Sequence, residues 1–99
     1  MEIIHLENEK NFTELIKSNK ILVDFFANWC GPCKMLAPVL EKVESNVKVI
    51  KVDTDEYEDL AREYDVFSIP CLVLFKDGKE ASRSVGLKPK EEIEKFIGV

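Results

Sequence analysis

The stretch ILVDFFA, residues 21–27, constrains the fold more than any other part of the chain. Its residues are apolar at both odd and even positions, and only Asp24 interrupts them. A strand with one face in water alternates apolar and polar residues, whereas a strand covered on both faces is apolar throughout. The stretch therefore predicts a central strand whose sheet has helices on both sides, with one carboxyl group buried among apolar side chains.

The rest of the chain alternates between strand and helix patterns. Short apolar runs predict further strands at residues 3–6, 47–53, 71–75 and 81–85. Helical spacing predicts helices over about residues 8–18, 31–45 and 56–64, and a last one from Pro89 onward. Asp55 and Glu58 have the spacing of a helix capping box. The Asp77-Gly78 pair predicts a tight hairpin turn between the last two strands.

The predicted element order is β-α-β-α-β-α-β-β-α. Strands that alternate with helices favour a largely parallel sheet, and the final hairpin adds antiparallel pairing. We therefore predict an α/β protein, a three-layer sandwich in which helices flank a mixed central sheet. Its 99 residues suit one domain, residues 1–99, with a core that needs no disulfide to hold it together.

Charge and hydropathy exclude several classes of protein. The chain has 19 acidic and 14 basic side chains, a net charge of −5, and no basic stripe, which disfavours nucleic acid as a partner. The N-terminus does not resemble a secretion signal, and no apolar run reaches the roughly 18 residues of a membrane span. We expect a cytoplasmic protein that does not associate with membranes.

The sequence WCGPCK, residues 29–34, places two cysteines at the predicted junction of the central strand and a helix. Such a pair can bind a metal, staple the fold or act as a redox dithiol. A helix N-terminus stabilises a thiolate through its free N–H groups and partial positive charge, so Cys30 is the expected nucleophile. Cys33, one turn further on, would be more buried and would act as the resolving thiol.

A metal site remains an alternative at this point. Cys30, Cys33, Cys71 and His5 add up to four ligands, and an odd cysteine count favours chemistry or metal binding over a disulfide framework. Structural zinc sites usually bring a second closely spaced ligand pair, which the chain lacks. We therefore expect no metal. We expect Cys71 to be a buried, inert thiol and His5 to be structural.

Four segments resemble the thioredoxin family, and the agreement with the family extends over essentially the whole chain. The segments are VDFFANWCGPCK, which contains WCGPCK, and IKVDTDE, SIPCLVLFKDGK and SVGLK. The resemblance implies the thioredoxin fold and a protein disulfide reductase that works by dithiol–disulfide exchange through Cys30 and Cys33. It also implies a monomeric electron carrier without a cofactor, which acts on protein disulfides and is recycled by a thioredoxin reductase. A subunit or chaperone of this fold with an incidental dithiol is the competing possibility.

The resemblance also implies roles for residues near the dithiol. Asp24 matches the family's buried acid, which would relay the proton of Cys33, and Lys51 matches the lysine beside that acid. On the residues alone, Asp24 could equally be an acid satisfied by local hydrogen bonds. Trp29, Gly31 and Pro32 complete the motif.

Substrate contacts are implied for Trp29, Ile69, Pro70 and Gly86. Pro70 falls in the family's cis-proline segment opposite the dithiol, and Gly86 at the glycine of a surface groove. On the residues alone, Pro70 could be an ordinary proline at the start of a strand. Departures from the family pattern at Phe26, Asn28, Phe67, Ser68 and Cys71 bear on the choice of partner, not on the type of reaction.

Overall fold

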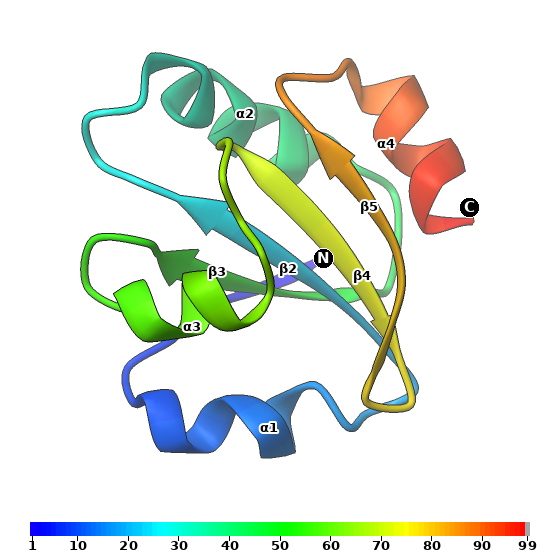
Figure 1. The fold of residues 1–99 in the computed structure, drawn as a ribbon. Helices are drawn as coiled ribbons and strands as arrows, with labels where there is room; N and C mark the ends of the chain where they lie inside the picture. The colour runs from blue at the N-terminus through cyan, green and yellow to red at the C-terminus, as the bar shows by residue number, and fades with distance from the viewer. Residues whose placement is uncertain (99) are drawn as a thin grey trace.

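The computed structural model of the chain describes residues 1–98, and a five-stranded sheet lies at its centre (Figure 1). The strands have the order β1-β3-β2-β4-β5 in the sheet. Along the chain the elements are β1 (Glu2–His5), the 3-10 helix η1 (Glu9–Asn11), α1 (Phe12–Leu15), β2 (Lys20–Phe26), α2 (Gly31–Lys42), β3 (Lys48–Asp53), α3 (Glu58–Glu63), β4 (Cys71–Lys76), β5 (Lys79–Val85) and α4 (Lys90–Ile97). The predicted order of strands and helices is confirmed.

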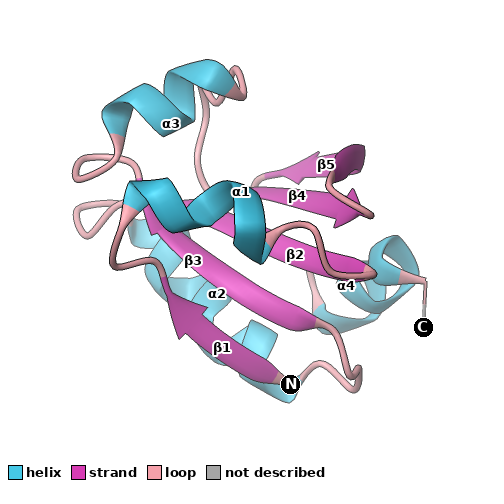
Figure 2. Ribbon diagram, turned by 90° about the horizontal axis from the view of Figure 1, so that it is seen from below, coloured by secondary structure: helices cyan, strands magenta, loops and turns pink. Residues whose placement is uncertain are grey.

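Helices cover both faces of the sheet, as Figure 2 shows, with α1 and α3 on one side and α2 and α4 on the other. The apolar residues of β2 divide between the two layers. Val23 and Phe25 pack in a core with Phe12 of α1, whereas Leu22 packs with Leu36 of α2. The central strand is therefore buried on both faces, and the predicted three-layer α/β sandwich is confirmed.

The sheet is less parallel than the alternation of strands and helices predicted. β1 and β2 both pair with β3 in parallel, but β4 runs antiparallel to β2 and to β5. The reason lies in the connection after β3, because α3 has only six residues and does not carry the chain back along the sheet. As a result β4 starts at the end of the sheet where β2 finishes, with Cys71 paired to Phe25.

A β-bulge in β5 creates a side-chain cluster that the sequence does not reveal. The register shifts so that Arg83 pairs with Val73 and Glu80 with Phe75, which leaves Ala81 as the extra residue. Glu80 and Arg83 therefore point to the same face although they are three residues apart. The Arg83 guanidinium donates to both carboxylate oxygens of Glu80 at 2.8 Å and to the Tyr64 carbonyl at 2.7 Å. This contact fastens β5 to the end of α3.

Three local predictions were wrong in detail. The capping box at α3 does not form, because the helix begins after Tyr57 without a side-chain cap. The first helical segment spans only η1 and α1 and ends at Leu15, and α2 ends at Lys42 instead of near residue 45. Helix ends depend on tertiary contacts that the apolar spacing does not encode.

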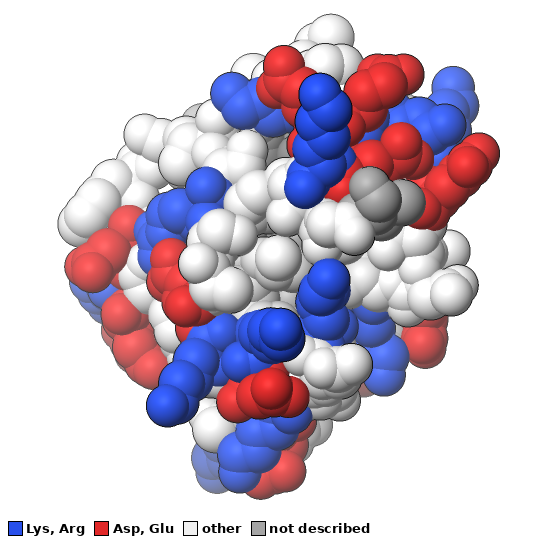
Figure 3. Space-filling view, turned by 90° about the vertical axis from the view of Figure 1, so that its right-hand side faces the viewer, with Lys and Arg blue, Asp and Glu red and all other residues white. Residues whose placement is uncertain are grey.

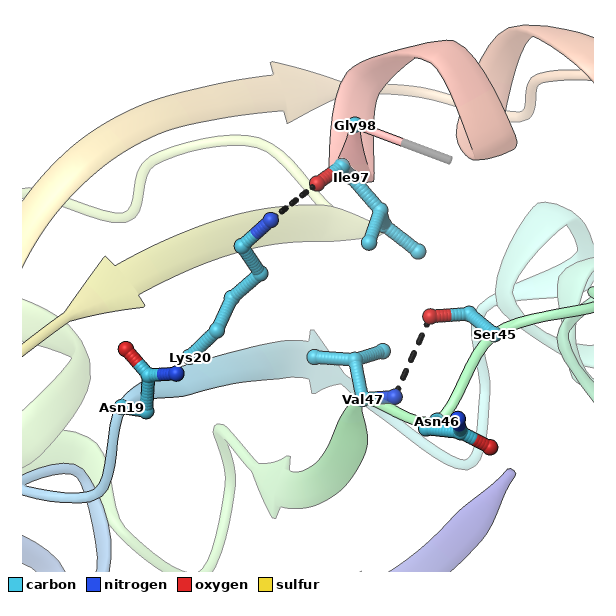
Figure 4. A pocket seen from close by; sticks show the side chains of 7 residues that line it. All are labelled: Asn19, Lys20, Ser45, Asn46, Val47, Ile97 and Gly98. Atoms are coloured by element: carbon cyan, nitrogen blue, oxygen red, sulfur yellow. Dashed lines mark hydrogen bonds between the residues drawn. The ribbon is translucent and has the colours of Figure 1, made fainter.

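The end of the sheet far from the WCGPCK motif contains a shallow hollow, drawn in Figure 4. Lys20, at the start of β2, donates from Nζ to the Ile97 carbonyl at 3.0 Å. Gly98 ends α4 in the left-handed conformation with φ +96°, which glycine adopts without steric cost. The bond from Lys20 thus holds the C-terminal end of α4 against the start of β2, away from the cysteines.

On the face shown in Figure 3, acidic and basic side chains are interleaved and form no continuous basic area. Arg83 with Glu80 and Lys90 with Glu94 are pairs of opposite charge in β5 and α4. Among the described residues, no helix has both the length and the apolar character required to cross a membrane.

Candidate redox site

The two cysteines of WCGPCK lie at the N-terminus of α2, directly after the end of β2. Cys30 is the N-cap residue, with extended backbone angles, and its Sγ accepts a hydrogen bond from the Cys33 N–H at 3.2 Å. Cys30 and Cys33 form a disulfide, with their Cα atoms 5.2 Å apart. The structure therefore holds the dithiol in its oxidised form, with the Cys30 sulfur facing a backbone donor of the helix.

Gly31 and Pro32 separate the cysteines and form the first turn of α2. Proline suits this position because its missing N–H would have no partner within the helix. A Cβ atom at Gly31 would meet nothing within 4 Å. The surface at Gly31, between the two cysteines, is therefore open.

The prediction that Cys33 is more buried than Cys30 was wrong for this form of the protein. Both residues are 4% exposed, and both pack against Ala27 with Phe26 and Ile69 alongside. Because the disulfide joins the two sulfurs, both cysteines pack against the same side chains and are buried to the same extent. What distinguishes the cysteines is position on the helix, because only Cys30 is the N-cap.

Asp24 lies in β2 on the side of the sheet that faces α2, next to Leu22 and Phe26 in the strand. Its side chain is 1% exposed, and neither carboxyl oxygen has a hydrogen-bond partner within residues 1–98. Lys51 is its register partner in β3, and Lys51 Nζ lies 3.4 Å from Asp24 Oδ2 at an ion-pair distance. Burial raises the pKa of Asp24 above its ordinary value, and the Lys51 charge only partly opposes that rise.

Lys51 links this acid to the surroundings of the dithiol. Its ammonium lies 4.6 Å from the centroid of the Phe26 ring, a cation–π distance. Lys51 and Cys33 also line the same small hollow, together with Lys34 and Ala37 of α2. The acid, the lysine and the second cysteine therefore lie on one side of the sheet under the start of α2.

Pro70 lies beside the dithiol because of the antiparallel direction of β4. The Ile69–Pro70 peptide bond is cis, as the resemblance implied. Ile69 packs against the cluster that contains both cysteines, and in Figure 1 the loop before β4 approaches the start of α2. Gly86, with φ +96°, donates its N–H to the Pro70 carbonyl at 2.8 Å, so these two residues are adjacent in space.

Two large apolar side chains are exposed in the segments that carry the dithiol and Pro70. Trp29 is 70% exposed, and Phe67 is also exposed. The Trp29 indole donates from Nε1 to Asp55 Oδ2 at 2.9 Å, which fixes the ring although it lies in solvent. Asp55 was predicted as a helix cap and instead holds the tryptophan of the motif.

Cys71 is a buried free thiol, as predicted. It is 1% exposed, and burial raises the pKa of its thiol while the nearby Arg83 opposes the shift. Within the described part of the chain, no three side chains of the His, Cys, Asp and Glu types are grouped so that they could hold one metal ion.

The comparison with protein families decides the assignment. A model of the family described as Thioredoxin matches residues 3–98 of the chain. The chain belongs to the thioredoxin family. The thioredoxin of Chlamydia trachomatis serovar D is 50% identical to it over 98 residues, covering 96% of each chain. The thioredoxin of Bacillus subtilis is 42% identical over 93 residues, covering 90% of this chain and 89% of the relative.

Solved thioredoxin structures confirm the fold. A mutant thioredoxin from Halobacterium salinarum aligns with a TM-score of 0.90 at 36% identity, over 97% of this chain and 88% of that one. The oxidised form of mitochondrial thioredoxin 3 from Saccharomyces cerevisiae aligns with a TM-score of 0.86 at 41% identity, over 96% and 92% of the two chains. The chain has the family and the fold of thioredoxins, and Cys30 and Cys33 are at disulfide distance. The site is therefore that of a dithiol–disulfide oxidoreductase.

Sequence reasoning missed two residues near this thioredoxin site. Asp55 holds Trp29, and His5 lies beside Lys51 in register on β1. No local pattern points to either contact. Strand order and register bring these residues together from segments that are far apart in the sequence.

Proposed function

We propose that this thioredoxin-family chain reduces disulfides in other proteins, as a monomeric electron carrier with one domain, residues 1–99. The observation that carries the proposal is the position of Cys30 at the N-cap of α2, with its Sγ accepting the Cys33 N–H. That backbone donor and the helix dipole favour a negatively charged sulfur at Cys30 once the disulfide is reduced.

In the first step, the Cys30 thiolate attacks one sulfur of a target disulfide. A bond forms between Cys30 Sγ and that sulfur, the target S–S bond breaks, and the second target sulfur leaves as a thiolate. Gly31 favours this approach because the space around it is open.

In the second step, Cys33 loses its thiol proton and attacks Cys30 Sγ. The mixed disulfide breaks, the remaining target sulfur leaves as a thiolate, and the Cys30–Cys33 disulfide forms. We assign the proton to the Asp24 carboxylate, because burial raises the pKa of that group and so strengthens it as a base. Lys51, 3.4 Å from Asp24, partly balances the negative charge of the carboxylate before the proton is transferred.

Trp29, Ile69, Pro70 and Gly86 would form the surface on which the target binds. Trp29 offers an exposed ring that the bond to Asp55 holds in place. Within the part of the chain that the structure describes, the backbone of Ile69 takes part in no backbone–backbone hydrogen bond. Its free N–H and carbonyl groups suit an extended target segment that pairs like an added strand.

The proposal includes the return of the oxidised protein to the dithiol form by a thioredoxin reductase, in the cytoplasm. Gly31 and Pro32 place no cationic residue between the thiols, so reduced Cys30 gains no stabilisation from a charge between the two cysteines. A dithiol of this kind gives up its electrons readily and acts as a reductant.

Reduction of insulin disulfides by the purified protein tests the proposal. With dithiothreitol as the electron source, the wild type and Cys71→Ser should both accelerate insulin precipitation, whereas Cys30→Ser and Cys33→Ser should not. Cys33→Ser should also trap target proteins as mixed disulfides at Cys30. A double Cys30→Ser, Cys33→Ser variant that retains activity in the cell would show that the dithiol is incidental and would overturn the proposal.

A further inference from the structure

Three ionisable side chains form a row across the strands β1, β3 and β2. His5 is the register partner of Lys51, and Lys51 is the register partner of Asp24. Side chains alternate between the two faces along each strand, and register partners point to the same face. All three side chains therefore lie on the side of the sheet that α2 covers.

The exposure of the row falls in steps from solvent toward the dithiol. His5 is exposed, the Lys51 side chain is 11% exposed and that of Asp24 is 1% exposed. The His5 side chain is thus in contact with solvent on one side and lies next to Lys51 on the other. His5 is therefore the residue of the row that exchanges protons most directly with the solvent.

Phe26 holds the cationic end of the row together. Its ring packs edge-on against the His5 imidazole with centroids 6.4 Å apart, and Lys51 Nζ lies 4.6 Å from its centroid. His5, Phe26 and Lys51 line the same hollow as Cys33. The imidazole therefore packs on Phe26 at the exposed edge of a hollow that Cys33 also lines.

The other charged groups near His5 do not cancel its effect on the buried acid. The groups that face it from neighbouring elements are Lys51 and Asp53 of β3, Lys34 of α2, Asp24 of β2 and Glu56 ahead of α3, with Glu7 two residues further along its own segment. Asp53 and Glu56 line a neighbouring hollow that does not include Cys33, where Glu56 is exposed and Asp53 half-buried, so water screens their charges in part. Positive charge on His5 lowers the pKa of Asp24, in the same direction as Lys51 but more weakly.

We propose that the charge of His5 controls how readily Asp24 takes up the proton of Cys33, which makes His5 a positioning residue for the second step of the exchange. Histidine is the side chain whose charge ordinarily changes between pH 5 and 8. A neutral His5 makes Asp24 a stronger base, and a charged His5 makes it a weaker one. The role of His5 in the exchange reaction rests on the proposed function. The electrostatic coupling between His5 and Asp24 does not depend on turnover and can be measured without it.

The test follows the Asp24 carboxyl carbon by NMR during a pH titration of the oxidised protein, where no exchange takes place. Replacing His5 with glutamine removes the charge, and the Asp24 titration should move to higher pH by a few tenths of a pH unit, as for a partly exposed charge pair. His5→Lys keeps a positive charge at all pH values of interest and should return the titration to the wild-type position or below it. Lys48→Gln removes a cation from the far end of β3 and is the matched control.

A second measurement links the coupling to the reaction. In reduced protein, the pH at which Cys33 resolves a mixed disulfide at half its maximal rate should shift in the same direction in His5→Gln and return in His5→Lys. An unchanged Asp24 titration in His5→Gln would overturn the inference, as would an equal shift in Lys48→Gln or a failure of His5→Lys to restore it. A wild-type protein that fails to reduce insulin would instead refute the proposed function, whatever the titration shows.

Discussion

Lys51 Nζ lies 3.4 Å from Asp24 Oδ2, yet neither oxygen of the Asp24 carboxyl group accepts a hydrogen bond within residues 1–98. A buried carboxylate normally satisfies its oxygens with several donors, and one lysine at ion-pair distance does not replace them. The acid is thus kept in a costly environment beside the dithiol. That cost and the proposed proton transfer can be separated by mutation.

Asp24→Asn should stabilise the protein at pH 7 by roughly 1 kcal/mol or more, because burial raises the pKa of Asp24 and a difference of one pKa unit between the folded and unfolded states corresponds to about 1.4 kcal/mol. Since the folded protein raises the pKa of Asp24, it binds this proton more tightly than the unfolded chain does. The resulting stability is complete below the unfolded pKa and is lost as the pH rises through the folded pKa. Urea unfolding should therefore show a gain at pH 7 that shrinks toward pH 4.

The same variant should lose speed, because an amide cannot accept the Cys33 proton. Resolution of the mixed disulfide should slow by roughly 10²-fold, the lower end of what a positioned base contributes. Glu41→Gln, on the exposed side of α2, removes a carboxylate without either effect and is the control. Lower stability at pH 7 together with unchanged resolution would contradict the role assigned to Asp24.

In the reduced protein, Cys30 should react with iodoacetamide roughly tenfold faster than Cys33 near pH 7. A helix N-terminus in a partly buried site stabilises a negative charge by up to about 2 kcal/mol, which is enough for this ratio. Mass spectrometry of the carbamidomethylated peptides measures both rates. Equal rates, or a faster Cys33, would show that the N-cap position does not select the nucleophile.

Cys71 should remain unmodified in the folded protein. Burial raises the pKa of its thiol, and the side chain is packed in β4 between its partners in β2 and β5. A thiol reagent should therefore find one free thiol per oxidised molecule, and only after denaturation. Fast labelling of the native protein, or a disulfide from Cys71 to Cys30 or Cys33, would make it a regulatory thiol.

Arg83→Gln should lower the free energy of unfolding by about 1 to 2 kcal/mol, since it removes charge-assisted hydrogen bonds to Glu80 and to the Tyr64 carbonyl. Hydrogen bonding from Arg83 lowers the pKa of Glu80, so this stabilisation is present above the unfolded pKa and is lost as the pH falls through the folded one. The difference between variant and wild type in urea unfolding should shrink on acidification. Arg62→Gln, which breaks an exposed pair with Asp59, should change the stability by less than about 0.5 kcal/mol. Similar losses in both variants would mean that the link between β5 and α3 contributes nothing of its own.

The sequence by itself determined the elements and the chemistry of the motif. Residues 21–27 are apolar at every position but one, and this local pattern is enough to predict a strand buried on both faces, because side chains alternate along any strand. The position of Cys30 at the start of a helix follows equally from neighbouring residues. The cis bond at Pro70 and the acid–lysine pair came from family resemblance and not from the local pattern.

Only the tertiary structure decided which distant residues meet. Antiparallel β4 brings Pro70 to the dithiol, a bulge at Ala81 turns Arg83 toward α3, and Asp55 binds Trp29 instead of capping a helix. Strand order and register likewise place His5 in the row with Lys51 and Asp24. Such contacts depend on loop length, strand direction and register, which are settled by the packing of the whole core and leave no periodic trace in the residues that take part.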